Sequence, residues 1–582
     1  MHSVVTHQHG FETEFRKTEC CVVGGGMAGL CSALASARNG VKTLLIQDRP
    51  VLGGNASSEV RMWICGAHGK DAKEGGILEE ILLRNLYYNR GMKYTIWDDI
   101  LYGICREEPL LEVIFSCSVN EVRSEGRKIS GVTAWHLTRQ CYIEVEAKAF
   151  VDASGDSVLS TCGAEMRWGR ESRHEYDESH APEEADDKTM GNSVLIQLRE
   201  VDEHVPFTAP PWAKTFEEEA LANRGLRPQG NFWWLEFGGI MDTIADSDKI
   251  RDENLAIAYG AWDLIKNHPD GRGQGWELEW IGSLPGKREN KRYVGDVLLN
   301  QRDVEAGGDF EDVVAHGGWS MDDHHPDAIN HRGPPTIFHP APSPYGIPYR
   351  SLYSKDFDNL WCAGRNISAT HMAMSSTRVM GTTSVMGQAV GTAVSIAIKK
   401  GISNRGVYGE ATSDLQAMLL EQDQYLPGYT RSVNASDRGG SLEWEGGDAS
   451  ALLDGHERQL GEEDHGVWMA AGEKVTWNFS EPKNFDSVRL ILDSDFSRTK
   501  RMPCSFPKKG NEAEMPAHLL KNGKIEVKRK GKWEPLHEIE NNFLRRVQLP
   551  LEDNLEGVRF TPTSTWGGEK LLVYSFDLLG SD

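Results

Sequence analysis

The stretch that decides the fold is Val22-Val-Gly-Gly-Gly-Met-Ala-Gly29, which precedes a second apolar stretch, Leu44-Leu-Ile-Gln-Asp48. The pattern predicts a strand, a tight glycine turn, a helix and a second strand. Gly24 permits the turn, Gly26 lets the backbone approach a pyrophosphate, and Gly29 lets the helix pack closely on the sheet. The N-terminus of the helix presents unpaired N–H groups to phosphates. The stretch therefore predicts a dinucleotide site, the alternative being a glycine-rich turn that binds nothing.

A stretch of small residues after the second strand and three later segments favour FAD over NAD as the dinucleotide. Residues 51–61 are mostly small, so the chain can cross close to a long cofactor just after the second strand. Residues 150–156 predict a strand that runs into a tight turn, and residues 359–365 predict a strand that ends in Gly-Arg. Residues 382–398 predict an apolar helix lined with small residues. Because these segments are far apart, we expect one FAD domain interrupted by a long insertion.

These motifs, in this order, resemble a bacterial FAD-dependent oxidoreductase family that carries Gly53-Gly-Asn-Ala-Ser-Ser-Glu59 after the glycine fingerprint. The family is a distant relative of the fumarate reductase and succinate dehydrogenase flavoproteins. The resemblance covers roughly residues 18–430 and rests also on residues 234–239, 286–292, 317–326, 347–351 and 364–371. In most flavoproteins a glutamate binds the adenosine ribose where this chain has Gln47, which leaves the identity of the ribose ligand open.

We expect the cofactor to contact residues of the fingerprint, of the second strand, of the stretch of small residues and of the three later segments. In the family's relatives the N-terminus of the late helix meets the pyrimidine edge of the flavin, which implies residues 382–388 here. The expected cofactor-binding residues are Gly24, Gly26, Met27, Ala28, Gly29, Gln47, Asp48, Arg49, Gly53, Gly54, Asn55, Ala56, Ser57, Val119, Ala153, Ser154, Gly155, Asp156, Gly364, Arg365, Thr382, Met386 and Gly387. No histidine lies within residues 51–61, although His68 follows shortly, so we expect non-covalent FAD.

The insertion is the expected site of substrate chemistry. Histidine has a pKa near neutrality and suits a base that takes a hydroxyl proton while hydride moves between carbon and flavin N5. The candidates are His324, His325 and His371, each with a structural or solvent-facing histidine as the alternative. Arg288 and Arg292 are candidates for orienting a carboxylate or a hydroxyl-rich substrate, or for surface ion pairs. The cluster Asp322-Asp-His-His325 lacks a spaced third ligand, so no metal is expected.

The insertion is also rich in tryptophan. Trp262 has the spacing of a helix core, whereas Trp276, Trp280 and Trp319 lie among glycine and charged residues, where a sugar ring would find a stacking surface. From about residue 431 the sequence changes to alternating strand-like runs, which predict an all-β sandwich. This part resembles the galactose-binding-like jelly-roll modules of carbohydrate enzymes. A scaffold domain is the equally weighted alternative.

Composition excludes several classes of partner. The formal net charge of −24 opposes a nucleic-acid partner, because such proteins need a basic face. No apolar run reaches the ~18–20 residues of a membrane span, and residues 1–15 lack a signal-peptide core, so we expect a cytoplasmic protein. The ten cysteines contain no C-x-x-C pair, and only Cys65 lies near the expected flavin. The oligomeric state is left open.

The expected fold class is an α/β Rossmann-like FAD-binding domain (15–160 and 341–430) divided by an inserted α+β substrate domain (161–340), plus a C-terminal β-sandwich (431–582). The expected function is an FAD-dependent oxidoreductase acting on a small molecule, a carbohydrate or sugar derivative. One alternative is a flavin-dependent lyase or isomerase without net oxidation. The other is a carbohydrate-binding protein whose flavin is vestigial.

Overall fold

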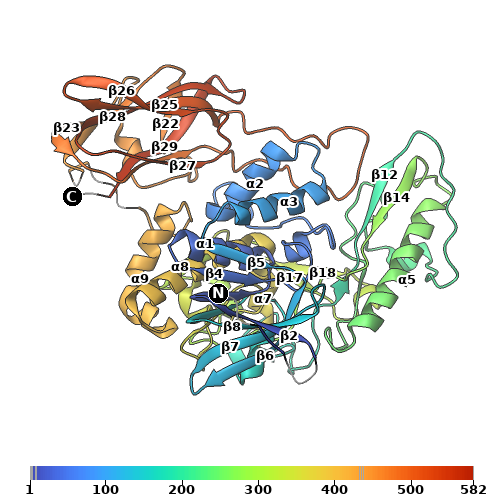
Figure 1. Ribbon diagram of the computed structural model, residues 1–582. Helices are drawn as coiled ribbons and strands as arrows, with labels where there is room; N and C mark the ends of the chain where they lie inside the picture. The colour runs from blue at the N-terminus through green and yellow to red at the C-terminus, as the bar shows by residue number, and fades with distance from the viewer. Residues whose placement is uncertain are drawn as a thin grey trace. The chain divides into compact units, whose positions relative to one another are not determined.

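The computed structural model describes residues 4–6, 10–431, 433, 435–436, 438–463 and 465–580 (Figure 1). Contacts between residues divide the chain into two compact units. The first unit comprises Met1–His68, Gly91–Gln416 and Arg501–Glu512, and the second comprises Gly69–Arg90, Ala417–Lys500 and Ala513–Asp582. The domain boundaries expected at residues 160, 340 and 430 stay predictions.

A five-stranded parallel sheet is the centre of the first unit. Its strands run in the order β20 (Leu360–Cys362), β9 (Ala149–Asp152), β3 (Cys20–Val23), β4 (Thr43–Ile46) and β5 (Leu111–Ile114). Such strands are apolar throughout because helices and other chain segments cover both faces. In the register of the sheet, Val23 lies beside Ile46 on one side and Asp152 on the other, so the carboxyl ends of these strands meet at one edge.

Two helices pack against each other beside this sheet, α1 (Met27–Arg38) and α8 (Met380–Lys400) (Figure 1). Their backbones approach closely because glycines of α8 face α1. A Cβ at Gly387 would lie 2.1 Å from the carbonyl oxygen of Ala28, and a Cβ at Gly391 would lie 2.1 Å from that of Ser32. The small residues in the late helix thus serve helix packing.

Around this core the first unit carries a second five-stranded sheet, five two-stranded sheets and further helices. The second sheet is β1 (Val4–Thr6), β2 (Glu12–Lys17), β8 (Cys141–Glu146), β7 (Lys128–His136) and β6 (Cys117–Glu125). The pairs are β10 (Met166–Arg167) with β15 (Arg292–Tyr293), β11 (Asn192–Ser193) with β13 (Glu236–Phe237), β12 (Ile196–Glu200) with β14 (Trp276–Ile281), β16 (Val313–Gly317) with β19 (Tyr345–Pro348), and β17 (Met321–His324) with β18 (Thr336–His339). The helices are α3 (Tyr94–Arg106), α4 (Arg173–Tyr176), α5 (Ser247–Lys266), α6 (Gln301–Glu305), α7 (His371–Thr377) and α9 (Asn404–Glu421), whose last residues enter the second unit.

The second unit contains two antiparallel sheets and helix α2 (Gly76–Tyr88). One sheet is β21 (Gly440–Trp444), β23 (Val475–Lys483), β28 (Leu555–Thr565), β25 (Leu520–Arg529) and β26 (Lys532–Ile539). The other is β22 (Val467–Ala470), β29 (Lys570–Leu579), β24 (Ser487–Leu492) and β27 (Arg546–Pro550). The two sheets meet where Trp477 Nε1 of β23 donates to the carbonyl oxygen of Phe576 in β29 at 2.9 Å. The predicted α/β fold with a C-terminal β-sandwich is confirmed.

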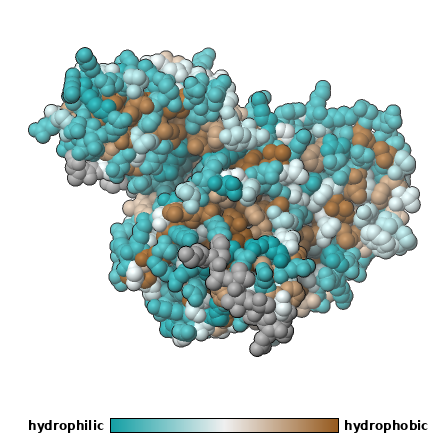
Figure 2. All heavy atoms as spheres, viewed as in Figure 1, coloured by the Kyte–Doolittle hydropathy of each residue, from teal (hydrophilic) through white to brown (hydrophobic). Residues whose placement is uncertain are grey.

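The visible surface is mostly hydrophilic, with hydrophobic residues gathered in smaller patches (Figure 2). Among the described residues, none of the helices combines the length and the apolar character of a membrane span.

Candidate active site

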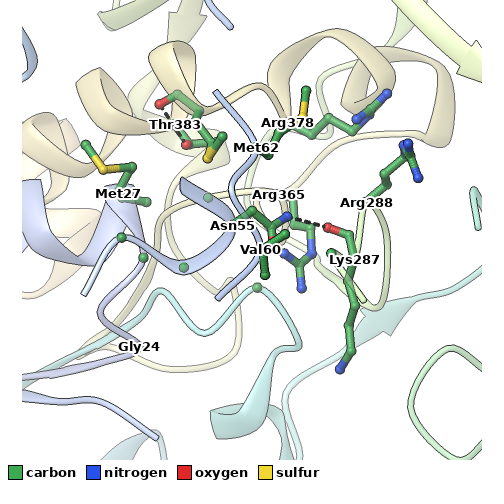
Figure 3. A pocket seen from close by; sticks show the side chains of 18 of the residues that line it. Gly24, Met27, Asn55, Val60, Met62, Lys287, Arg288, Arg365, Arg378 and Thr383 are labelled. Carbon is green, nitrogen blue, oxygen red and sulfur yellow. Dashed lines mark hydrogen bonds between the residues drawn. The ribbon is translucent and has the colours of Figure 1, made fainter. Parts of the chain in front are cut away.

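A cavity of about 460 Å³ opens at the carboxyl ends of the parallel strands of the first unit (Figure 3). The residues that follow β3, β4, β9 and β20 all reach its wall: Gly24, Gln47, Ala153 and Gly364. Ligands of open parallel sheets bind at this edge. The sheet thus brings together segments that the sequence separates by more than three hundred residues.

The glycine turn after β3 is shaped by close backbone contacts. Gly24 has a φ of +99°, and a Cβ there would lie 2.6 Å from the carbonyl oxygen of Ala153. A Cβ at Gly29 would lie 1.8 Å from the oxygen of Gly24. Gly26, the N-cap of α1, faces open space, because its nearest neighbour would be the Gly54 Cα at 4.0 Å. The N-terminus of α1 therefore has room for a phosphate beside it.

Gln47 closes this turn rather than pointing freely into the cavity. Its Oε1 accepts a hydrogen bond from the backbone N–H of Gly25 at 2.7 Å, and its Nε2 donates to the carbonyl oxygen of Val51 at 2.9 Å. The side chain is only 3% exposed. The neighbouring Asp48 and Arg49 also line the cavity, so the adenosine-ribose end offers more than one polar group.

A charged trio lies on the opposite wall of the same cavity. Asp156 accepts hydrogen bonds from Arg365 Nη2 at 2.8 Å and from Lys287 Nζ at 2.6 Å. Although burial opposes ionisation, Arg365 and Lys287 hold the pKa of Asp156 below its usual range. The Lys287 backbone is fixed in turn, because its carbonyl oxygen accepts from Asn55 Nδ2 at 2.9 Å (Figure 3).

The structure places most of the predicted cofactor residues on the cavity wall. Those that line it are Gly24, Gly26, Met27, Ala28, Gln47, Asp48, Arg49, Gly53, Gly54, Asn55, Val119, Ala153, Ser154, Gly155, Asp156, Gly364 and Arg365. Those outside the lining are Gly29, Ala56, Ser57, Thr382, Met386 and Gly387. The last three lie too deep in α8, where Gly387 packs on α1.

The start of α8 reaches the cavity, and one of its lining residues, Thr383, lies within the predicted range 382–388. Val379, Met380 and Thr383 line the wall. The N-terminus is held there because the N–H of Gly381 donates to the carbonyl oxygen of Cys65 at 2.7 Å. Burial raises the pKa of the Cys65 thiol to about 11, so this cavity-lining cysteine is protonated at neutral pH.

Of the three candidate histidines, His324 is the one that lines the cavity. It is the last residue of β17 and is almost fully buried. Its Nδ1 lies 2.6 Å from Glu236 Oε2, and its Nε2 lies 3.4 Å from Asp322 Oδ1. Burial opposes ionisation of both carboxylates, but His324 and neighbouring arginines keep the pKa of each below its usual range. Two carboxylates thus flank this imidazole, one at each ring nitrogen.

Two arginines complete this end of the cavity, Arg288 and Arg378 (Figure 3). Arg288 Nη1 lies 3.4 Å from Glu236 Oε2, and its Nη2 donates to the carbonyl oxygen of Trp233 at 2.8 Å. Arg378 Nη2 donates to Asp322 Oδ2 at 3.2 Å. Both guanidinium groups thus have carboxylate partners as well as a face toward the cavity.

The remaining candidates lie elsewhere. His371 and Arg292 are buried in a separate ion-pair network, in which Glu289 Oε1 is 3.0 Å from His371 Nδ1 and 2.5 Å from Arg292 Nη1. Burial opposes protonation of His371, but Glu289 and Asp323 raise its pKa to about 10.

His325 stacks on His331 at a centroid distance of 3.6 Å. Alternate residues of a strand face opposite sides, which separates Asp323 from Asp322.

Some residues of the site were not predicted from the sequence. Glu236, which contacts His324 but is not part of the cavity lining, belongs to the 234–239 motif, so a signal for it was present. Trp63, Arg378 and Arg501 line the cavity, and no sequence motif indicated them. Of the tryptophans proposed to stack on a sugar, Trp319 lines the cavity. Trp276 instead belongs to the hydrophobic core around α5, with Trp262.

The hydrogen-bond donors on the cavity wall suit a dinucleotide. Several buried donors on its wall have no hydrogen-bond partner within the described part of the chain: Trp63 Nε1, Trp319 Nε1, Arg49 Nη1, Arg365 Nε and Arg378 Nε. Buried donors are normally satisfied, so an acceptor-rich ligand fits here. In the parts of the chain that the structure describes, no group of three or more histidine, cysteine or acidic side chains is placed to hold a metal ion.

Comparison with known proteins agrees with this geometry. The sequence model of a family described as "FAD dependent oxidoreductase" matches residues 19–419. A search of curated proteins finds no match.

Three solved structures are among those that a structural search matched to this chain. A geranylgeranyl bacteriochlorophyll reductase-like protein from Thermoplasma acidophilum is 14% identical, with a TM-score of 0.32 over 70% of this chain and 84% of that chain. The fumarate reductase subunit FrdA of E. coli is 12% identical, with a TM-score of 0.28 over 70% and 74%. A family 32 carbohydrate-binding module from Streptococcus pneumoniae is 12% identical, with a TM-score of 0.19 over 24% and 94%.

Proposed function

The chain belongs to the FAD-dependent oxidoreductase family, and from this premise we propose that it interconverts a hydroxyl and a carbonyl group on a carbohydrate or sugar derivative, with His324 handling the hydroxyl proton. The observation that carries the proposal is the placement of a buried histidine, between two carboxylates, on the wall of the cavity that the glycine turn also lines. Bound FAD supplies the hydride chemistry.

His324 is supported as the proton-handling group by its partners. Glu236 fixes the ring through Nδ1 at 2.6 Å, whereas Nε2 has only the longer contact of 3.4 Å with Asp322 Oδ1, so we assign proton exchange with the substrate to Nε2. Proton uptake from a hydroxyl creates positive charge on the ring, and Glu236 and Asp322 stabilise that charge. In the opposite direction the same arrangement supplies the proton.

A sugar-like substrate is supported by the character of the wall. Trp233, Trp319 and Phe338 present aromatic surface, and Arg288 and Arg378 present donors. Aromatic rings suit the apolar face of a sugar, while guanidinium groups suit its hydroxyls or a carboxylate. An all-apolar substrate would leave Arg378 Nε, which has no partner within the described part of the chain, without an acceptor.

We also propose that FAD is bound without a covalent link. His68, the histidine nearest the segment 51–61, is outside the cavity lining and stacks on Trp319 at a centroid distance of 4.5 Å. Denaturing the purified holoprotein in acid should release all of its flavin into the supernatant. Flavin that remains with the precipitated protein would contradict this part of the proposal.

The test of function is the visible spectrum of the purified holoprotein during anaerobic addition of sugars and sugar acids. We expect one compound to bleach the flavin bands. The His324→Gln variant should lower the rate of bleaching by about 10²–10⁴-fold, while the matched control His325→Gln, one residue away and outside the cavity, should not change it. Failure of every compound would refute the substrate class, and an unchanged rate in His324→Gln would refute the role of His324. Multiple turnovers of substrate without consumption of an added electron acceptor would favour elimination or isomerisation.

A further inference from the structure

A segment of the chain that lies between two strands of the β-sandwich in sequence belongs to the first unit in space. Residues 501–512 fall between β24 and β25, yet they are part of the unit that contains the cavity. Arg501, the first residue of this segment, lines the cavity itself.

The segment is held in the first unit by regular backbone contacts. Phe506 exchanges two hydrogen bonds with β12: its N–H donates to the carbonyl oxygen of Leu198 at 2.7 Å, and its own oxygen accepts from the N–H of Glu200 at 2.9 Å. The carbonyl oxygen of Pro503 accepts from Gln197 Nε2 at 2.8 Å and from the Tyr94 hydroxyl at 3.1 Å. These hydrogen bonds fix the backbone a few residues beyond Arg501, which helps to hold Arg501 at the cavity.

Arg501 differs from the other cations of the cavity in having no carboxylate partner among the described residues. The other pairs are Lys287 and Arg365 with Asp156 at 2.6 and 2.8 Å, Arg378 with Asp322 at 3.2 Å, Arg288 with Glu236 at 3.4 Å, and Arg49 with Asp48 and Glu59, both at 3.9 Å. Arg501 instead lies over the ring of Trp63, 4.9 Å from its centroid. Arg501 is an exposed residue that lines the cavity, so a ligand in the cavity can reach it.

The environment of Cys65 shows which end of the cavity Arg501 occupies. Arg501, Asp322 and Arg378 all act electrostatically on the Cys65 thiol. Asp322 and Arg378 belong to the His324 end, and Cys65 bonds the N-terminus of α8. Arg501 is thus near the groups at the end where we place the substrate.

We propose that Arg501 is a specificity-determining residue that binds a carboxylate of the substrate, and that the substrate is therefore a polyhydroxylated acid, such as a uronic or aldonic acid, rather than a neutral sugar. A planar guanidinium held over Trp63 offers two parallel N–H donors to a carboxylate. The Trp63 ring fixes the orientation of the Arg501 guanidinium. Because no carboxylate of the described residues pairs with Arg501, binding a substrate carboxylate breaks no ion pair of the protein. This inference deepens the proposed function and rests on it for the placement of the substrate.

The test compares acids with their neutral parents in the FAD-loaded, full-length protein. Flavin difference spectra would be titrated with D-glucuronate, D-galacturonate and D-gluconate, and with D-glucose, D-galactose and D-glucitol. We expect at least one acid to bind, and Arg501→Gln to weaken its binding by about tenfold or more. Arg501→Lys should recover only part of the loss, because lysine keeps the charge without the two parallel donors. Lys508→Gln, in the same segment and outside the cavity lining, is the matched control and should bind as the wild type does.

Three results would overturn the inference: no acid binds, a neutral parent binds as tightly as its acid, or Arg501→Gln binds the acid unchanged. An unaltered flavin content and absorption spectrum shows that the variant is folded. The readout also separates the two proposals. Acids that bind through Arg501 but never bleach the flavin would refute the hydride chemistry alone, whereas neutral sugars that bleach wild type and Arg501→Gln equally would refute the acid specificity alone.

Discussion

Replacing Gly387 by alanine tests the close packing of α1 on α8 that positions the dinucleotide turn. The added Cβ would lie 2.1 Å from the carbonyl oxygen of Ala28 and 2.9 Å from its carbonyl carbon. Those atoms are backbone, so the helices must move apart by about 1 Å to restore an ordinary contact. Overpacking of this kind costs about 1–3 kcal/mol. The clash with backbone favours the upper half of that range.

The helix propensity of alanine offsets part of this cost. Alanine is about 1 kcal/mol more favourable than glycine inside a helix. The net loss in the free energy of unfolding is therefore about 1–2 kcal/mol. Because Ala28 is in the first turn of α1, whose N-terminus faces the cavity, the displacement should also weaken FAD binding.

Gly391→Ala is the matched control for the second effect. Its Cβ would lie at the same 2.1 Å from a carbonyl oxygen, that of Ser32, one turn further from the cavity. Both variants should lose similar stability in urea unfolding of the apoprotein, followed by tryptophan fluorescence. Only Gly387→Ala should also raise the dissociation constant of FAD, measured by flavin fluorescence. An apoprotein of unchanged or raised stability in both variants would refute the packing described here.

Three further predictions concern titratable groups. Glu236→Gln should slow flavin bleaching by about 10-fold or more, because Nδ1 of His324 loses its ionised partner; stopped-flow bleaching that matches the wild type would contradict this. The pKa of His371 is raised to about 10, so its ionic contribution to stability is fully present below the unfolded pKa of ~6.5 and is lost as the pH rises through 10. Urea unfolding between pH 6 and 11 should show a fall in stability that His371→Gln lacks, and parallel curves would count against it. Cys65→Ser should keep the bleaching rate within about twofold, since the thiol is protonated at neutral pH; a large loss would assign the thiol a part in the chemistry.

The sequence predicted the dinucleotide-binding edge well because its signals are local. A glycine turn between an apolar strand and a helix has few alternatives, and the carboxyl ends of parallel strands must share an edge. In the late helix, the sequence did not distinguish residues that line the cavity, such as Thr383, from residues that pack on α1, such as Gly387. Sequence alone does not tell which small residue does which.

The substrate end could be predicted only in part. Adjacent Asp322 and Asp323 look equivalent in the sequence, and the alternation of β17 sends one toward His324 and the other toward His371. The partner Glu236 reaches His324 through tertiary folding alone. Arg501 could not be predicted from the sequence. It lies in a stretch between two strands of the sandwich, and nothing in that stretch indicates that residues 501–512 belong to the first unit.

Closing the glycine turn with an amide rather than a carboxylate has a consequence for how the cofactor is retained. Gln47 donates to one backbone oxygen and accepts from one backbone N–H, a pairing that a carboxylate cannot reproduce because it lacks a donor when ionised. The shape of the turn is thus independent of protonation and of salt. Acidification can then weaken the binding of FAD only through titratable groups elsewhere on the cavity wall. It does not open the turn that receives the phosphates of FAD.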